Sequence, residues 1–123
     1  MENSRFKFRA WDKSQNKMYQ VRGINFDNED LWLKINETQI MGANLFEVEL
    51  MQYTGLKDKN GTEIYEGDIV FDSHCEENGK VIFDEGCFAI EWETTIEDLF
   101  ENCDIYEVIG NAYQNPELLK EGE

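Results

Sequence analysis

Apolar and polar residues alternate with a period of two along several short stretches, and this alternation constrains the fold more than any other feature. It is cleanest in residues 5–11, 31–35 and 46–50. Successive side chains of a β-strand point to opposite faces, so these stretches predict strands with one buried face. Further strands are predicted at residues 18–21, 69–71, 79–83, 87–92 and 106–110. The sequence therefore predicts a mainly β fold, α+β at most, built as a small antiparallel barrel or sandwich.

Glycines and polar residues mark the turns between these strands. Gly55, Gly61 and Gly67 fall six residues apart. Asn60-Gly61 is a dipeptide that supplies the positive φ angles of a tight hairpin turn. The sequence predicts turns or loops at residues 12–17, 23–30, 58–61, 66–68 and 84–86. Residues 36–45 fit neither a strand nor a helix pattern.

Helical signals are confined to the last third of the chain. Thr94 and Glu97 have the spacing of a capping box, in which two side chains satisfy backbone N–H groups at a helix start. An apolar stripe with helical spacing follows at Ile96, Leu99, Phe100 and Cys103. These features predict one short helix near residues 95–102. Asn115-Pro116 predicts a second short helix at the C-terminal end, because Pro is favoured at the first helical position.

The length of the chain bounds its organisation. A chain of 123 residues with 41% hydrophobic residues is the size of one domain and can bury a core. We expect a single domain over residues 1–123, with no linker or internal repeat. Its subregions are an N-terminal β region at 1–55, which includes 22–45, and a barrel region at 56–123.

The charge of the chain excludes two classes of partner. The formal net charge is −16, so DNA, RNA and anionic membranes would repel the protein. No apolar run is long enough to span a membrane, and the first residues lack the apolar core of a signal peptide. These features predict a cytoplasmic protein that binds neither nucleic acid directly nor a membrane.

The charge is also distributed unevenly. Residues 1–22 carry a net of +4, whereas residues 23–123 carry −20. A basic terminal strand with Arg5, Lys7 and Arg9 on one side could pair with a neighbouring copy, which would give a homo-oligomer with contacts through residues 5–22. The alternative is that this strand closes its own barrel beside residues 104–113.

Catalytic and metal-binding motifs are sparse. The three cysteines form no C-x-x-C pair, and no phosphate-binding or zinc-protease motif is present. His74 and Cys75 are adjacent, but adjacent residues of a strand face opposite sides, so a polar loop with a reduced thiol is the better interpretation. The Asp58–Glu63 segment has a calcium loop's residue types in the wrong order, which favours a hairpin turn. We predict no catalytic residue, no metal site and no cofactor.

Three segments together resemble the YopX family of bacteriophage and prophage proteins. The central one is long and specific, and the other two match the family's opening and close: QYTGLKDKNGTEIYEGDIV at 52–70, RAWD at 9–12 and EVIGNAYQNPELL at 107–119. The resemblance runs from residue 5 to residue 119, with 22–45 as a variable insertion. It implies a phage or prophage origin and a mostly β structure, and it carries no reaction, cofactor or catalytic residue.

The recurrent residues of the resemblance have a physical interpretation. Gly55, Gly61 and Gly67 are expected to be turn glycines, and Asp68 is expected to accept a backbone hydrogen bond within its turn. Residues 66–92 are also similar to a small SH3-like barrel, which would form the C-terminal half of the fold.

The aromatic residues of this region have two interpretations. They are Tyr53, Tyr65, Phe71, Phe83, Phe88 and Trp92. Such residues form a barrel core more often than a surface groove for peptides. If a groove exists, Tyr53, Tyr65 and Trp92 are its candidate protein-binding residues, together with Arg5, Lys7 and Arg9 of the basic strand.

Three functions remain open. The first is a non-enzymatic phage or prophage accessory protein of the host cytoplasm, which acts by binding another protein or by self-assembly. The second is an acidic DNA mimic that inhibits a host nucleic-acid-binding protein, because spaced carboxylates can imitate phosphates. The third is a divalent-metal-dependent hydrolase using a cluster of carboxylates, such as Glu76/Glu77 or Asp84/Glu85.

Overall fold

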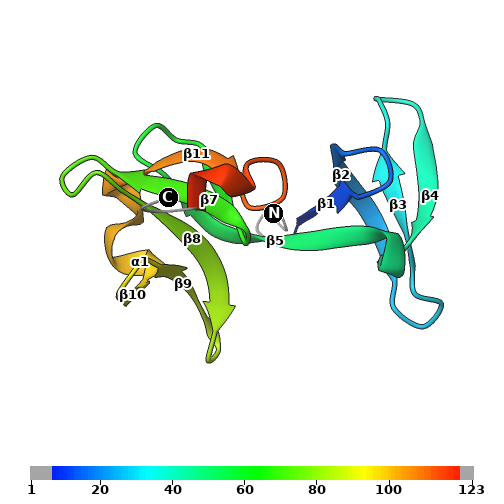
Figure 1. The fold of residues 1–123 in the computed structure, drawn as a ribbon. Helices are drawn as coiled ribbons and strands as arrows, with labels where there is room; N and C mark the ends of the chain where they lie inside the picture. Colours follow the sequence, from blue (N-terminus) through cyan, green and yellow to red (C-terminus); the bar gives the residue numbers. More distant parts are fainter. Residues whose placement is uncertain (1–6, 120–123) are drawn as a thin grey trace. The chain divides into compact units, whose positions relative to one another are not determined.

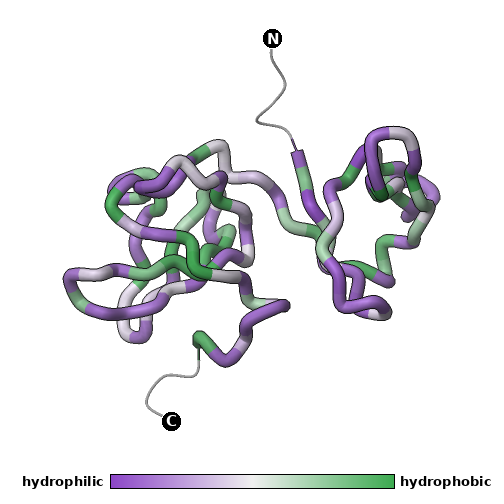
Figure 2. The backbone as a smooth tube through the Cα atoms, turned by 90° about the horizontal axis from the view of Figure 1, so that it is seen from above, coloured by the Kyte–Doolittle hydropathy of each residue, from purple (hydrophilic) through white to green (hydrophobic). Residues whose placement is uncertain are grey.

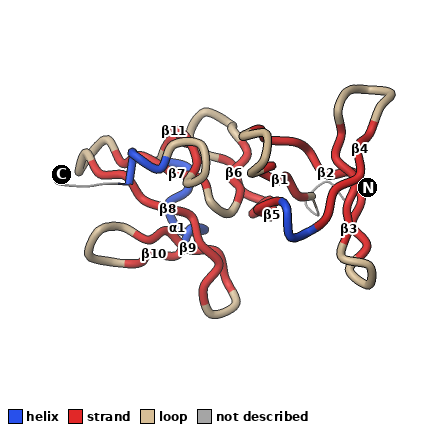
Figure 3. The backbone as a smooth tube through the Cα atoms, turned by 45° about the vertical axis from the view of Figure 1, so that its right-hand side comes forward, coloured by secondary structure: helices blue, strands red, loops and turns tan. Residues whose placement is uncertain are grey.

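The structure is a computed structural model that describes residues 7–119. It divides into two compact units, residues 1–52 and 53–123. Figure 1 shows strands throughout both units, and helices are few and short (Figure 3). The expectation of a mainly β fold is confirmed.

The first unit is built from consecutive antiparallel strands. They are β1 (Phe8–Asp12), β2 (Lys17–Asn25), β3 (Asp30–Lys34), β4 (Ile40–Asn44) and β5 (Val48–Lys57), with a 3-10 turn, η1 (Leu45–Glu47), before β5. The second half of β5 continues into the second unit, where β6 (Glu63–Tyr65) pairs with it. The sheet has the order β4-β3-β2-β1-β5-β6.

Alternating residues of these strands form the core of the first unit. Ala10, Leu31 and Leu33 are fully buried there, together with Tyr19 and Val48. Hydrophilic residues, purple in Figure 2, cover most of the outer loops of the unit. The predicted alternation of residues 31–35 is confirmed for Leu31 and Leu33, which point to the same interior face, but Ile35 lies beyond the end of β3 and is 44% exposed.

The N-terminal strand does not lie at a sheet edge. β1 pairs with β2 on one side and with β5 on the other. Its backbone groups are therefore used on both sides, which contradicts the premise that a neighbouring copy pairs with this strand. The alternative pairing beside residues 104–113 is also wrong for residues 8–12, because β2 and β5 occupy both sides of β1.

The second unit contains a five-stranded sheet and the short helices. Its elements are β7 (Asp68–Asp72), β8 (Glu77–Asp84), β9 (Cys87–Glu91), β10 (Ile96–Asp98), α1 (Leu99–Asn102), η2 (Cys103–Ile105), β11 (Glu107–Asn111) and η3 (Pro116–Leu119). The strand order is β10-β9-β8-β7-β11, and all pairs are antiparallel. The predicted short C-terminal helix is confirmed as the 3-10 helix η3.

Neither sheet closes into a barrel within residues 7–119. In the second unit β10 and β11 form the two edges of the sheet, and no pairing joins them. β10 is only three residues long and leads directly into α1, so the chain leaves the sheet before it can meet β11. The expectation of a closed barrel is corrected to two open antiparallel sheets.

The helix near residues 95–102 begins later than its capping box predicts. Trp92 N–H donates to the carbonyl of Thr95 (2.8 Å), which closes a turn between β9 and β10. Residues 96–98 then pair with β9 as a strand, and α1 starts at Leu99 with Asp98 as its cap. Strand pairing across the turn therefore overrides the local helix signal.

Two other local expectations need correction. Gly55 has a φ of 85°, but it lies inside β5 at an irregularity of the pairing with β6 and not in a turn. A strand bulge uses the same left-handed conformation as a turn, so sequence cannot distinguish them. Residues 23–25, expected in a loop, continue β2, and the ambiguous segment 36–45 contains β4.

Candidate functional site

An apolar cleft on the second unit is the most developed surface feature among the described residues. It consists of two adjoining hollows that share Leu56 and Phe100. One has a volume of about 530 Å³ and the other about 330 Å³. Their remaining lining residues are Thr54, Phe83, Gly86, Cys87, Phe88, Asp98, Glu101, Cys103 and Asp104. We call this surface the Phe100 cleft.

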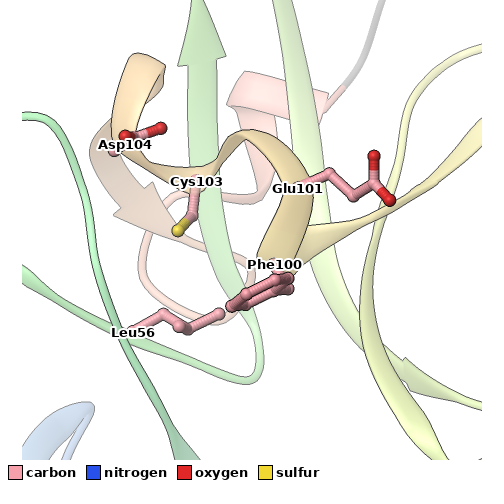
Figure 4. Close-up of a pocket in the computed structure, with 5 residues that line it drawn as sticks. All are labelled: Leu56, Phe100, Glu101, Cys103 and Asp104. Carbon is pink, nitrogen blue, oxygen red and sulfur yellow. The ribbon is translucent and has the colours of Figure 1, made fainter.

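Phe100 is on the surface because α1 begins at Leu99. Leu99 is the first helical residue and is fully buried in the core. The next residue is turned by about 100° around a helix of 3.6 residues per turn. Phe100 is consequently 73% exposed. In Figure 4 its ring lies next to the end of the Leu56 side chain, and Cys103 is drawn above them in the view.

The β8–β9 hairpin supplies the other aromatic residues. Phe83 and Phe88 are cross-strand neighbours whose rings meet edge to face, with centroids 5.1 Å apart. Phe83 is 53% exposed, whereas Phe88 and Leu56 pack against the core of the unit. The wall of the cleft is therefore continuous with the core, which gives it a fixed shape.

Carboxylates surround this apolar surface. Asp98, Glu101 and Asp104 line the two hollows, and Figure 4 shows Glu101 and Asp104 on either side of the apolar contact. The wider surroundings have the same sign, because residues 53–123 contain 19 Asp and Glu against four Lys and Arg. Residues 1–52 contain eight against seven. The negative charge of the protein is thus concentrated in the unit that carries the cleft.

A partly buried hydrogen-bond network fixes α1 next to the cleft. The carboxylate of Glu97 accepts bonds from the indole N–H of Trp92 (2.9 Å), the hydroxyl of Tyr106 (2.9 Å) and the amide of Asn102 (2.5 Å). The rings of Trp92 and Tyr106 also meet edge to face. Burial raises the pKa of Tyr106, and its hydrogen bond to Glu97 raises it further. Tyr106 therefore stays protonated and donates to Glu97 at neutral pH.

The candidate binding residues predicted from sequence do not form one site. Tyr53, Tyr65 and Trp92 are buried, and the rings of Tyr53 and Tyr65 pack 5.4 Å apart. Their side chains offer little surface to a partner, in agreement with the core interpretation of the aromatic residues. Lys7 and Arg9 are half-buried in the first unit, and Arg5 lies outside the described residues.

The segment that carries the family resemblance is explained by local structure. Asp58 is buried, and its Oδ1 accepts from the backbone N–H of Asn60 and of Thr62, both at 2.8 Å. Asp68 accepts from the N–H of Tyr65 (2.8 Å). The predicted turns at Gly61 and at Asp68 are confirmed. Within residues 7–119, no group of three or more His, Cys, Asp and Glu is arranged to hold a metal ion.

His74 and Cys75 lie in the exposed loop between β7 and β8. The N–H of His74 donates to Asp72 (2.9 Å). The negative charge of Asp72 raises the pKa of the Cys75 thiol, and a hydrogen bond to Asp72 raises it further. The thiolate is the nucleophilic form, so this loop lacks an activated cysteine.

Asp72→Asn is expected to accelerate alkylation of Cys75 by iodoacetamide at pH 8. The amide removes the charge that raises the pKa of the thiol but keeps an oxygen that can accept from the N–H of His74. Mass spectrometry of timed digests measures each cysteine separately. Cys87 is the internal control, because it is also exposed. Equal rates at Cys75 in both proteins would contradict this prediction.

Sequence reasoning missed the two central residues of the cleft, Leu56 and Phe100. It assigned Phe100 to a buried stripe because it placed the helix start too early. Asp98 was the available signal, since Asp is a favoured cap and a start at Leu99 turns Phe100 outward.

None of the described helices is long and apolar enough to cross a membrane.

Comparisons with known proteins find similar sequences and similar folds over nearly the whole chain. Residues 7–120 match the family described as YopX protein. The crystal structure of protein EF1440 from Enterococcus faecalis is similar, with 31% identity and a TM-score of 0.68 over 94% of this chain and 98% of that one. The X-ray structure of protein yopX from Bacillus subtilis has 25% identity and a TM-score of 0.64 over 93% and 98%. No curated protein matches the sequence. The resemblance seen in residues 52–70 is confirmed, and this chain belongs to the YopX family.

Proposed function

We propose that this protein is a non-enzymatic phage or prophage accessory protein that binds a basic segment of another protein in the Phe100 cleft. The observation that carries the proposal is the combination of exposed Phe83 and Phe100 with a border of carboxylates. Exposed aromatic residues in a shaped hollow are typical anchors of protein interfaces. Their position on an acidic unit specifies the charge of the partner.

The chemistry of the cleft defines what fits it. An aromatic or aliphatic side chain of the partner would pack against Leu56 and Phe100. Lys or Arg residues on either side of that anchor would lie near Asp98, Glu101 and Asp104. Charged groups at the rim mainly accelerate association and select partners, whereas burial of the apolar anchor provides most of the affinity.

Fluorescence anisotropy of the full-length protein with two labelled peptides tests the proposal. One peptide is rich in Lys and contains Phe, and the other is identical except that each Phe is replaced by Ser. We expect the Phe peptide to bind and the Ser peptide to bind at least about tenfold more weakly. Binding of both peptides should weaken as salt is raised to ~0.15 M and beyond.

Matched variants locate the binding surface. The double variant Phe83→Ala/Phe100→Ala should weaken binding of the Phe peptide by about tenfold or more. Phe46→Ala is the control, because Phe46 is 70% exposed but belongs to the first unit. Equal loss in the control would overturn the proposal. Equal affinity for the two peptides would also overturn it and would favour the acidic DNA-mimic function, in which charge alone is recognised.

A further inference from the structure

β4 forms an edge of its sheet and lacks the features that usually protect edges. It pairs with β3 alone among the described strands. Natural edge strands usually carry Lys, Pro or a bulge, which prevents another strand from adding to them. Residues 38–46 contain neither charge nor Pro, and the pairing of β4 with β3 runs without an irregularity. This uncharged stretch lies in a chain in which 31% of residues are charged.

The direction of the backbone groups follows from the pairing. The N–H of Ile35 donates to the backbone carbonyl of Gln39 (2.9 Å), and the N–H of Leu45 donates to the backbone carbonyl of Glu29 (2.8 Å). Residues 35 and 39, and residues 29 and 45, are therefore hydrogen-bonded pairs of the ladder. In an antiparallel ladder such pairs alternate with pairs that are not bonded. The odd-numbered residues of β4 therefore bond to β3. The N–H and C=O groups of Ile40 and Gly42 point away from β3, along the edge.

We infer that a second copy of this chain pairs with β4, antiparallel and centred on Met41. In this register the outward N–H and C=O groups of Ile40 bond to those of Gly42 in the other copy. By symmetry, the same groups of Gly42 bond to Ile40 of the other copy. The bulky Ile40 side chain then lies beside a glycine. Gly42 leaves open space around its Cβ position, and its partner on β3 is Trp32, which provides an apolar surface.

Charge favours a second copy as the occupant of this edge. The first unit has a net charge of only −1, whereas the second unit has −15. The strand that would pair therefore belongs to the nearly neutral unit, so charge repulsion between the paired units themselves is small. A basic partner, by contrast, finds no carboxylate within residues 38–46, and the flanking Glu37 and Glu47 already accept from Lys34 (3.2 Å) and from the N–H of Asn44 (3.2 Å). This self-association is independent of the Phe100 cleft, which belongs to the other unit.

Sedimentation of the full-length protein over a range of concentrations tests this inference. The wild type should approach twice the monomer mass at high concentration. Ile40→Lys/Gly42→Lys should raise the dimer dissociation constant by more than about tenfold, because it places like charges opposite each other. Both side chains fit sterically in the monomer, since Ile40 is 53% exposed and Gly42 is open.

A second edge strand supplies the control. Ile96→Lys changes a similarly exposed isoleucine on β10, an edge of the other sheet, and should leave the dimer intact. Circular dichroism of all variants checks that the fold is retained. A wild type that stays monomeric at the highest concentration would overturn the inference. A dimer that persists in the double Lys variant, or is lost in Ile96→Lys, would also overturn it.

Discussion

Asp58→Ala is expected to lower the free energy of unfolding by about 3–5 kcal/mol, one of the largest effects of any single substitution in this chain. The Asp58 carboxylate is 5% exposed. One oxygen holds the N–H groups of Asn60 and Thr62, and the other accepts from the N–H of Val108 at 2.8 Å. The substitution removes three bonds to a charged acceptor, each of which contributes about 1.5–3 kcal/mol, and the N–H groups of the exposed Asn60 and Thr62 recover part of this loss by bonding to water.

Asp58→Asn separates the two roles of this side chain. The amide oxygen can still cap the turn, but the amide nitrogen would face the N–H of Val108, so we expect a loss between those of wild type and Asp58→Ala. Asp27→Ala is the control, because Asp27 is an exposed aspartate in a turn of the first unit. Urea unfolding followed by circular dichroism measures all three. A midpoint for Asp58→Ala equal to that of Asp27→Ala would contradict the assigned role.

The features that sequence could predict are those set by neighbouring residues. The turn at Asn60-Gly61 and the hydrogen bond from Tyr65 to Asp68 depend on contacts within a few positions, and both are present. Residues 52–70 also identified the family. Their buried aspartates explain this segment as turn and strand chemistry, so a family signature can describe how a chain folds without marking where it binds.

The features that sequence could not predict depend on distant pairings. β1 is an inner strand because residues 48–52 pair with it, and nothing within the first strand indicates that partner. The start of α1 depends on the pairing of Ile96 with Glu91 across a turn. Since this start decides that Leu99 is buried and Phe100 exposed, the Phe100 cleft could not be located from apolar spacing alone.

Which aromatic residues are buried also depends on contacts with residues that are distant in the sequence. Tyr65 ends β6, a strand that the sequence analysis did not predict, and Trp92 follows the last residue of β9, so the period-two pattern does not show what either side chain packs against. Trp92 is buried because Tyr106, fourteen residues later, packs against its ring. Phe83, which lies in the predicted strand at 79–83, remains 53% exposed. Side chains of the same type therefore divide between core and surface according to tertiary contacts.

Glu97→Ala is the second substitution with a large expected effect, a loss of about 2–4 kcal/mol in the free energy of unfolding. The carboxylate of Glu97 is the shared acceptor for Trp92, Asn102 and Tyr106. Trp92 and Tyr106 are buried, so their indole and hydroxyl donors would lose their acceptor without gaining water. Urea unfolding of the full-length protein, followed by circular dichroism, measures the loss.

Two further variants distinguish the network from a general effect of charge. Glu97→Gln keeps the shape and one acceptor oxygen, so it should lose less than half as much stability as Glu97→Ala. Glu93→Ala removes a carboxylate from an exposed residue nearby and should change the free energy of unfolding by no more than about 0.5 kcal/mol. Equal losses in Glu93→Ala and Glu97→Ala would show that the network contributes nothing.

The same substitution links the network to the Phe100 cleft. Asn102 ends α1, and its bond to Glu97 fixes the helix that presents Phe100. Glu97 itself does not line either hollow of the cleft. We therefore expect Glu97→Ala to weaken binding of the Phe peptide in conditions where the variant is still folded, because α1 loses its fixed position. Glu97→Gln, which has the same charge as Glu97→Ala, should retain more of the binding, and equal losses in the two would contradict a positioning role for the network.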